Sequence, residues 1–231
     1  MTESVAHPLF PAGVLCDMDG LLLDSERLAR DAFVRACEEF GFAAKLDVYH
    51  LCIGSTSDKT RELLTAAYGP EFPYQAIDVR WSEHYHARLA EGPVPVKTGA
   101  LALLEFLREL QVPVALVTST RRTTALAKLS SAGLSGFFQQ TICGGETERG
   151  KPNPDPYLAA AAGLDLEPAR CWALEDSANG VRSAVGAGCT VFQVPDLVLP
   201  TDDLRELGHR IVTDLNDVRS VLERSRELDV S

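Results

Sequence analysis

The sequence contains no Cys-x-x-Cys pair, no long apolar run, and no basic segment followed by an apolar one at its N-terminus. Its six cysteines are scattered singly and mostly lie in apolar runs, which predicts packed thiols. The lack of an apolar run near the length of a membrane span argues against a transmembrane helix. The N-terminal pattern is not that of a signal peptide, so we expect a protein of the reducing cytoplasm.

Positive charge is also scarce. The chain has 22 Lys and Arg residues against 33 Asp and Glu residues, and a formal net charge of −11. This balance argues against nucleic acid or an anionic membrane as a partner, and no obligatory protein partner is evident. An anionic substrate would need local help from a metal ion or from a few placed cations.

The most informative stretch is Val14-Leu-Cys-Asp-Met-Asp-Gly20, an apolar run followed by two carboxylates. In an extended chain residues i and i+2 point to the same side, so Asp17 and Asp19 are predicted to face one small volume. Two carboxylates about 4 Å apart repel by roughly 4 kcal/mol at an effective dielectric near 20. A fold tolerates this if a cation, a shared proton or a reaction uses the pair. The alternative is a strand that ends in a plain Asp-Gly turn.

A chain of 231 residues with 45% hydrophobic residues can bury a sizeable core in one domain or two. Helical patterns run from Asp24 to Gly41, from Ser57 to Tyr68 and onward from Tyr74, and no strand pattern occurs from 25 to 94. Such a segment is far too long for a loop in a compact domain. We therefore predict a helical domain at residues 25–94, inserted into a core formed by residues 1–24 and 95–231.

From residue 95 onward helix and strand patterns alternate. Strands are predicted at 112–117, 141–143, 171–174, 190–194 and 211–212, with helices between them. This alternation predicts an α/β fold with a doubly wound parallel sheet, whose ligands bind at the carboxyl ends of the strands. The residues that fall at such ends are Asp17, Asp19, Thr118, Glu175 and Asp176. We expect them to share one site.

The four carboxylates predicted at these strand ends would repel one another strongly without a cation. Hard oxygen ligands in incomplete number suit Mg²⁺, which keeps waters and shares a phosphate oxygen. The alternative for the pair Glu175-Asp176 is that Asp176 or Ser177 caps the following helix, which would explain one acid but not its buried neighbour.

Lys151 lies just ahead of a predicted helix, and Pro152 holds its backbone away from helical geometry. This arrangement predicts that the Lys151 side chain has a fixed direction and is not a free charge on the surface. Residues 145–151 also match the first seven positions of a phosphate-binding P-loop. Pro152 stands where Ser or Thr should hold Mg²⁺, so we reject that motif.

These residues resemble the signatures of the haloacid dehalogenase superfamily, in its phosphatase and β-phosphoglucomutase-like branch with a small helical cap. The segment 17–25 is similar to the first signature, Thr118-Ser119 to the second, Lys151-Pro152 to the third and Glu175-Asp176-Ser177 to the fourth. Each alone is weak, but four in order at four strand ends are very specific. The resemblance implies a Rossmann-like core with residues 25–94 as an all-helical cap.

The resemblance also implies residue roles. Asp17 would be the nucleophile that takes the phosphoryl group as an aspartyl-phosphate, and Asp19 the general acid and base. The Thr118 hydroxyl and the Ser119 backbone N–H would hold phosphoryl oxygens, while Lys151 neutralises their charge.

Further positions complete the implied site. Gly20 is assigned to phosphate binding, and Arg121 is the core residue best placed to reach the rest of the substrate. Selectivity is predicted to lie in the loop at 54–58 and in the first cap helix. Mg²⁺ would be bound by Asp17, the Asp19 carbonyl, Glu175 and Asp176.

Three functions are compatible with this pattern. The β-phosphoglucomutases have a histidine five residues after the acid that precedes the cap and an arginine in a cap loop. Ala29 and Ser57 stand at these positions here, which favours simple hydrolysis over phosphomutation. A non-catalytic binding protein would not need the complete reactive set. We therefore predict a Mg²⁺-dependent phosphatase for a small phosphorylated metabolite, a sugar or sugar-acid phosphate.

Overall fold

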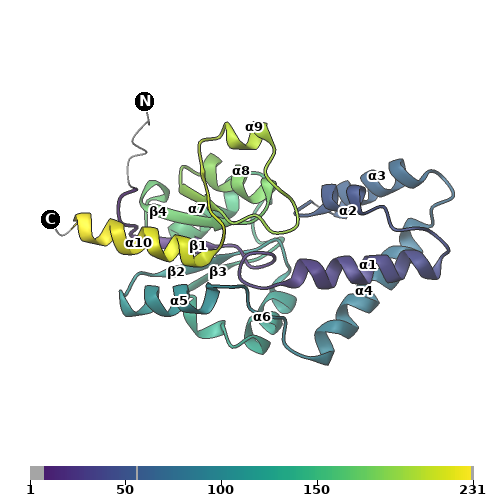
Figure 1. Ribbon diagram of the computed structural model, residues 1–231, viewed down its shortest axis with the longest axis horizontal. Helices are drawn as coiled ribbons and strands as arrows, with labels where there is room; N and C mark the ends of the chain where they lie inside the picture. The colour runs from purple at the N-terminus through teal and green to yellow at the C-terminus, as the bar shows by residue number, and fades with distance from the viewer. Residues whose placement is uncertain (1–7, 56, 230–231) are drawn as a thin grey trace.

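The computed structural model describes residues 8–55 and 57–229. Its centre is a six-stranded sheet in the order β3-β2-β1-β4-β5-β6, in which neighbouring strands are parallel (Figure 1). The strands are β1 (Gly13–Cys16), β2 (Val114–Val117), β3 (Gln140–Ile142), β4 (Cys171–Glu175), β5 (Thr190–Gln193) and β6 (Arg210–Ile211). The chain winds outward from β1 in both directions, as in doubly wound Rossmann-like sheets, which confirms the predicted fold class.

The central strands are short and apolar because both of their faces are covered. Every residue of β1 and β2 is buried, as expected for a parallel sheet with helices on both sides. Side chains alternate across the sheet, so Val14 and Cys16 belong to one hydrophobic cluster and Leu15 to the other.

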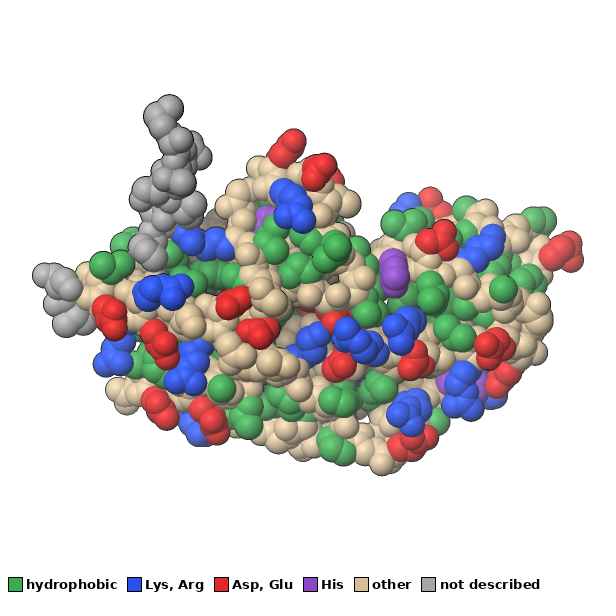
Figure 2. Space-filling model, viewed as in Figure 1, with side chains coloured by type: hydrophobic (Ala, Val, Ile, Leu, Met, Phe, Trp, Pro, Cys, Tyr) green, Lys and Arg blue, Asp and Glu red, His purple; other side chains and the backbone are tan. Residues whose placement is uncertain are grey.

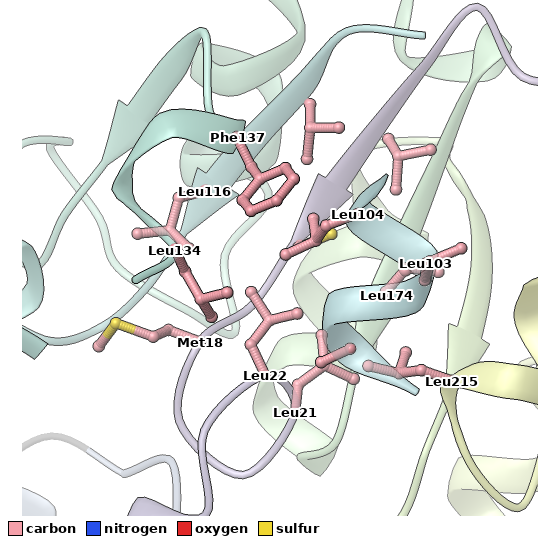
Figure 3. Packing of buried hydrophobic residues seen from close by; sticks show 14 of the residues in the cluster. Met18, Leu21, Leu22, Leu103, Leu104, Leu116, Leu134, Phe137, Leu174 and Leu215 are labelled. Carbon is pink, nitrogen blue, oxygen red and sulfur yellow. The ribbon is translucent and has the colours of Figure 1, made fainter. Parts of the chain in front are cut away.

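Helices form a layer on each face of the sheet. One face packs against α5 (Ala100–Glu109), α6 (Arg122–Ser131) and α10 (Leu215–Asp229), and the other against α7 (Asp155–Gly163), α8 (Ala178–Gly186) and α9 (Asp202–Arg205). Figure 3 shows the first layer, where Leu104 of α5 and Leu215 of α10 pack near Leu174 of β4.

The segment between β1 and α5 forms a helical lobe at one end of the molecule (Figure 1). It consists of α1 (Ser25–Glu39), α2 (Leu46–Cys52), α3 (Ser57–Tyr68) and α4 (Tyr74–Glu91). The lobe has a hydrophobic cluster of its own, in which the Phe33 ring lies 5.2 Å from Tyr49 and 5.0 Å from Trp81. Among the described residues from 25 to 94 there is no strand, as the sequence predicts.

The two chain segments that join the lobe to the sheet run side by side. The Asp24 N–H donates to the Pro95 carbonyl at 2.8 Å, and the Lys97 N–H donates to the Leu22 carbonyl at 2.9 Å. The Lys97 ammonium also pairs at 2.6 Å with Asp196, a buried carboxylate just after β5. The junction is therefore tied to the core at a point far along the chain.

Several elements differ from the sequence prediction. The helices α2, α9 and α10 were not predicted, because α2 and α9 are short and the apolar positions of α10 stand within a strongly charged segment. Helix α10 becomes recognisable only in the folded protein, where it packs against α5 and buries Leu215, Val218 and Leu222 in the same hydrophobic cluster. Strand β2 begins at Val114, since Pro113 has no N–H for the ladder.

Three sequence expectations can be compared with the structure directly. Five of the six cysteines are buried and Cys189 is half-buried, which confirms packed thiols. Within the described part of the chain, no helix is both long enough and apolar enough to cross a membrane. Figure 2 shows acidic and basic side chains intermixed on one face, without a broad basic patch on that face.

We expect Leu107→Ala to lower the free energy of unfolding by about 2–5 kcal/mol, because Leu107 is fully buried between α5 and the sheet. Leu101 of the same helix is 45% exposed, so Leu101→Ala should cost less than about 1 kcal/mol. Urea denaturation followed by circular dichroism measures both values. Equal losses in the two variants would contradict this packing.

Candidate active site

Polar side chains gather at the carboxyl ends of the central strands. Asp17 follows β1, Thr118 follows β2, and β4 ends at Glu175 with Asp176 next. The hydrogen-bond ladder continues one step further, since the Asp17 N–H donates to the Leu174 carbonyl at 3.0 Å. Because β2, β1 and β4 are neighbours, these side chains lie together at one edge of the sheet, which we call the mouth of the site.

The loop after β1 is held in place by its apolar residues. Met18, Leu21 and Leu22 are fully buried in the cluster shown in Figure 3. Apolar side chains therefore anchor the backbone on both sides of Asp19, so the polar residues between them have fixed positions.

Lys151 reaches the centre of this mouth from the loop between β3 and α7. Its ammonium lies 2.6 Å from Asp17 Oδ1, 2.5 Å from Glu175 Oε1 and 2.8 Å from the Val117 carbonyl oxygen. Burial alone would lower the pKa of Lys151, but Asp17 and Glu175 outweigh it and raise the pKa. The lysine is therefore charged. Its three contacts give the side chain a fixed direction, which is what the sequence predicts.

Glu175 has partners on both of its carboxylate oxygens. Oε1 accepts hydrogen bonds from Lys151 and, at 2.6 Å, from the Tyr157 hydroxyl. Oε2 faces the backbone N–H groups of Asp176 at 3.2 Å and Ser177 at 3.4 Å. This geometry makes Glu175 the group that holds Lys151 beside Asp17.

Negative charge exceeds positive charge in this mouth. One carboxylate oxygen from each of Asp17, Glu175 and Asp176 lies within 4.8 Å of the others, and all three residues are buried. Burial raises the pKa of Asp17 to about 8, and Lys151 offsets this only in part. Burial and the neighbouring Asp17 also raise the pKa of Asp176 well above its usual range. One ammonium thus faces three carboxylates.

This donor set fits a divalent cation. The three groups supply oxygen atoms only, which suits Mg²⁺ better than a metal that prefers nitrogen or sulfur ligands. The uncompensated charge of the cluster is what a bound cation would neutralise.

Gly20 lets the acidic cluster form. Its φ is +81°, and a Cβ on this residue would overlap the Asp176 carboxylate. The left-handed conformation and the close approach both require glycine. In the structure Gly20 makes room for Asp176, a function that the sequence assignment to phosphate binding did not include.

Asp19 has a separate set of partners. Its Oδ1 lies 2.5 Å from the Ser25 hydroxyl and 2.7 Å from the Lys128 ammonium, and its Oδ2 lies 2.6 Å from the Thr120 hydroxyl. Burial alone would raise the pKa of Asp19, but Lys128 and these hydroxyls lower it. Asp17 and Asp19 therefore pair with different lysines. Asp19 nevertheless lies close enough to Asp17 to add to the rise in the pKa of Asp17.

Sequence reasoning missed Lys128. It lies in α6, is 5% exposed, and places its ammonium 5.1 Å from the centre of the Tyr85 ring of α4. A lysine within a helix is usually solvated, so no local pattern marks it. The hydroxyls of Ser25 and Thr120 were likewise given no role, although Ser25 is the last residue of the first signature and Thr120 directly follows the second.

The remaining predicted residues lie around the same mouth. Thr118 is buried, and its Oγ1 accepts a hydrogen bond from the Thr120 N–H at 3.1 Å. Ser119 packs so closely against Gly144 that a Cβ there would overlap the Ser119 carbonyl. Arg121 is exposed at the start of α6, and it is not among the described residues that line the cavity beside Asp19.

A cavity of about 410 Å³ opens beside Asp19. Its walls come from α1, α3 and α4 of the lobe and, on the core side, from Asp19, Thr120 and Lys128. The volume is within the usual range for small-molecule sites. Ser55 and Ser57 of the predicted selectivity loop line it, whereas Asp58 of that loop pairs with Arg61 at 3.0 Å.

Comparisons with known proteins agree over nearly the whole chain. The family described as haloacid dehalogenase-like hydrolase matches residues 11–188. The phosphorylated carbohydrates phosphatase of Thermotoga maritima is 28% identical over 214 residues, which cover 91% of this chain and 89% of that protein. Hexitol phosphatase A of Escherichia coli is 30% identical over 219 residues, which cover 95% and 94%.

A solved structure extends this similarity to the fold. A HAD family hydrolase of Deinococcus radiodurans with bound phosphate and sodium aligns with a TM-score of 0.76 at 26% identity, covering 95% of this chain and 97% of that one. Both the sheet and most of the helical lobe are therefore shared with that protein.

We expect Gly180→Ala to destabilise the protein although Gly180 lies within α8. A Cβ at this position would overlap the Glu175 carboxylate, so the Lys151 cluster would have to shift, at a cost of about 1–3 kcal/mol. Gly186 of the same helix has its nearest neighbour 3.7 Å from a Cβ position. Gly186→Ala should therefore change stability by less than about 1 kcal/mol.

Thermal and urea unfolding of the two glycine variants provide the measurement. If Gly180→Ala were as stable as Gly186→Ala, the close packing of α8 on Glu175 would be wrong.

Proposed function

The chain belongs to the haloacid dehalogenase-like hydrolases and is a phosphatase, and we propose that it hydrolyses monophosphate esters of small sugar-like alcohols through an aspartyl-phosphate on Asp17. The observation that carries this proposal is the buried contact of Asp17 with Lys151 at 2.6 Å, inside a cluster with excess negative charge. Such a site holds a carboxylate nucleophile beside a fixed cation for the incoming phosphate.

In the first step an oxygen of Asp17 attacks phosphorus, and the bond from phosphorus to the ester oxygen breaks. Asp19 is the general acid: its carboxylate takes up a proton before this step, against the effect of Lys128 on its pKa, and gives that proton to the ester oxygen, so the product leaves as an alcohol. In the second step Asp19 takes a proton from water as the water oxygen attacks phosphorus. The bond to Asp17 breaks, and inorganic phosphate and the free carboxylate result.

The phosphoryl group needs positioning and charge neutralisation at the mouth. We assign its oxygens to the Thr118 hydroxyl, the Ser119 N–H and the Lys151 ammonium. Thr118 and Lys151 are both buried, so their hydrogen bonds act away from bulk water. Arg121 remains a predicted contact at the rim.

Mg²⁺ is the proposed cofactor. Asp17, Asp176 and the Asp19 carbonyl would hold it, and Glu175, a predicted fourth ligand, already accepts hydrogen bonds on both oxygens. Bound there, the ion would neutralise negative charge on the nucleophile and on the phosphate.

We propose that residues 25–94 act as a cap over the core of residues 1–24 and 95–231. The supporting features are the separate hydrophobic cluster of the lobe, the paired connections at Asp24 and Pro95, and the cavity between lobe and core. A hinge at these connections would let the cap admit the substrate and exclude water.

Hydrolysis is favoured over phosphomutation by two cavity residues. Ala29 and Ser57, which occupy the positions of the mutase histidine and arginine, both line the cavity beside Asp19. Neither can hold a second phosphate by charge. The complete set of reactive groups argues against a non-catalytic binding protein.

We expect Asp17→Asn to lower kcat by at least about three orders of magnitude, because an amide is a poor nucleophile. The fold should persist, since the change is isosteric and removes one charge from a crowded cluster. Phosphate release from p-nitrophenyl phosphate measures the rate. Asp165→Asn makes the same chemical change at an exposed position and should keep full activity. Substantial turnover by folded Asp17→Asn would exclude the covalent mechanism.

Removal of metal should abolish activity, and added Mg²⁺ should restore it. Only the folded state gathers the ligands, so Mg²⁺ at 100 times its Kd should stabilise the protein by about 2.7 kcal/mol. This stabilisation should appear as a higher melting temperature. Asp176→Asn should lose this shift, while Asp165→Asn keeps it. Full activity in excess chelator, with no metal found by mass spectrometry, would contradict the assigned ligands.

A further inference from the structure

The cavity beside Asp19 has an unusual charge balance for a phosphatase that would act on acidic metabolites. Among the described residues that line it, Lys128 is the one cation, and its ammonium lies 2.7 Å from the Asp19 carboxylate. Glu26 of α1 and Asp78 of α4 also line the cavity. Because Lys128 already pairs with Asp19, the described lining residues offer no second cation to balance Glu26 and Asp78.

Glu26 shows how the surroundings oppose a further negative charge. Burial and then the nearby Asp19 raise the pKa of the Glu26 carboxyl to about 7. A carboxylate or phosphate of a substrate in this cavity would lie beside the Asp19, Glu26 and Asp78 side chains.

The other lining groups suit an uncharged polyhydroxy ligand. Ser57, Thr60 and Ser82 place hydroxyl side chains around the cavity, and these can both donate and accept hydrogen bonds. The Trp81 indole N–H donates a hydrogen bond to the Ala29 carbonyl at 2.8 Å. The indole ring therefore contributes apolar surface to the cavity. Such a mixture of aromatic surface and hydroxyls is typical of sites for neutral polar molecules.

We propose that the cavity selects monophosphate esters whose alcohol is neutral or carries an amine, and that Glu26 and Asp78 select against alcohols bearing a carboxylate or a second phosphate. This inference rests on the proposed function and narrows it, since sugar-acid phosphates are excluded from the preferred substrates. The phosphate end of the substrate would then meet Lys151 and the proposed cation, while the alcohol end would meet Glu26 and Asp78.

The test compares probes that differ in one group. Sorbitol 6-phosphate and 6-phosphogluconate share a six-carbon chain but end in an alcohol or a carboxylate, and glucose 6-phosphate and glucosamine 6-phosphate differ by an amine. We expect kcat/KM for 6-phosphogluconate to be at least about tenfold below that for sorbitol 6-phosphate, which is about 1.4 kcal/mol. Glucosamine 6-phosphate should equal or exceed glucose 6-phosphate.

Variants then test the two carboxylates. Glu26→Gln combined with Asp78→Asn should bring 6-phosphogluconate to within about threefold of sorbitol 6-phosphate. A matched control, Glu71→Gln combined with Asp165→Asn, removes the same charge from exposed positions outside the cavity. The control should keep the wild-type ratio.

The outcomes separate this inference from the proposed function. If the wild-type protein fails to hydrolyse p-nitrophenyl phosphate and every sugar phosphate, the proposed function is wrong and the inference falls with it. If p-nitrophenyl phosphate is hydrolysed but 6-phosphogluconate matches or exceeds sorbitol 6-phosphate, only the inference is overturned. Hydrolysis of p-nitrophenyl phosphate alone would also overturn it, because the cavity would then not accept a polyol. The wild-type comparison decides the matter even if the variants do not fold.

Discussion

The buried contact between Lys151 and two carboxylates is the constraint on which the mouth of this sheet depends. Lys151 lies within 2.6 Å of both Asp17 and Glu175, and all three side chains are removed from water. Loss of Lys151 would leave two buried carboxylates without their cation, which typically costs about 3–5 kcal/mol. Lys151 therefore holds both carboxylates in place, and the position of the proposed nucleophile follows from this contact.

The parallel sheet supplies these groups because neighbouring strands end at one edge, but two glycines let them come close enough. Gly20 leaves room for Asp176, and Gly180 leaves room for the Glu175 carboxylate. Apolar anchors such as Met18 then fix the loop that carries the acids. Tight packing around a cluster of like charges indicates that the fold favours its function over its stability here, as functional sites often do.

Much of this arrangement could be predicted from the sequence because its signals are local. An apolar run followed by acids marks a strand end, and alternating patterns give a parallel sheet. The pairing of Lys128 with Asp19 could not be predicted, since it joins residues 109 positions apart and depends on how α6 packs. Helix α10 could not be predicted either, because its apolar residues find their packing partners only in the folded core.

The two lysines mark two regions of the site that differ in the positive charge they offer to a substrate. Lys151 lies in the core, where the proposed phosphate ligands and a bound cation would bring positive charge. Lys128 is neutralised by Asp19 and borders a cavity that also contains Glu26 and Asp78. A monophosphate ester of a neutral sugar has its charge at one end only, and it matches this division. An ester charged at both ends would place one charge against carboxylates, so the orientation of the bound substrate and its chemical class follow from the same asymmetry.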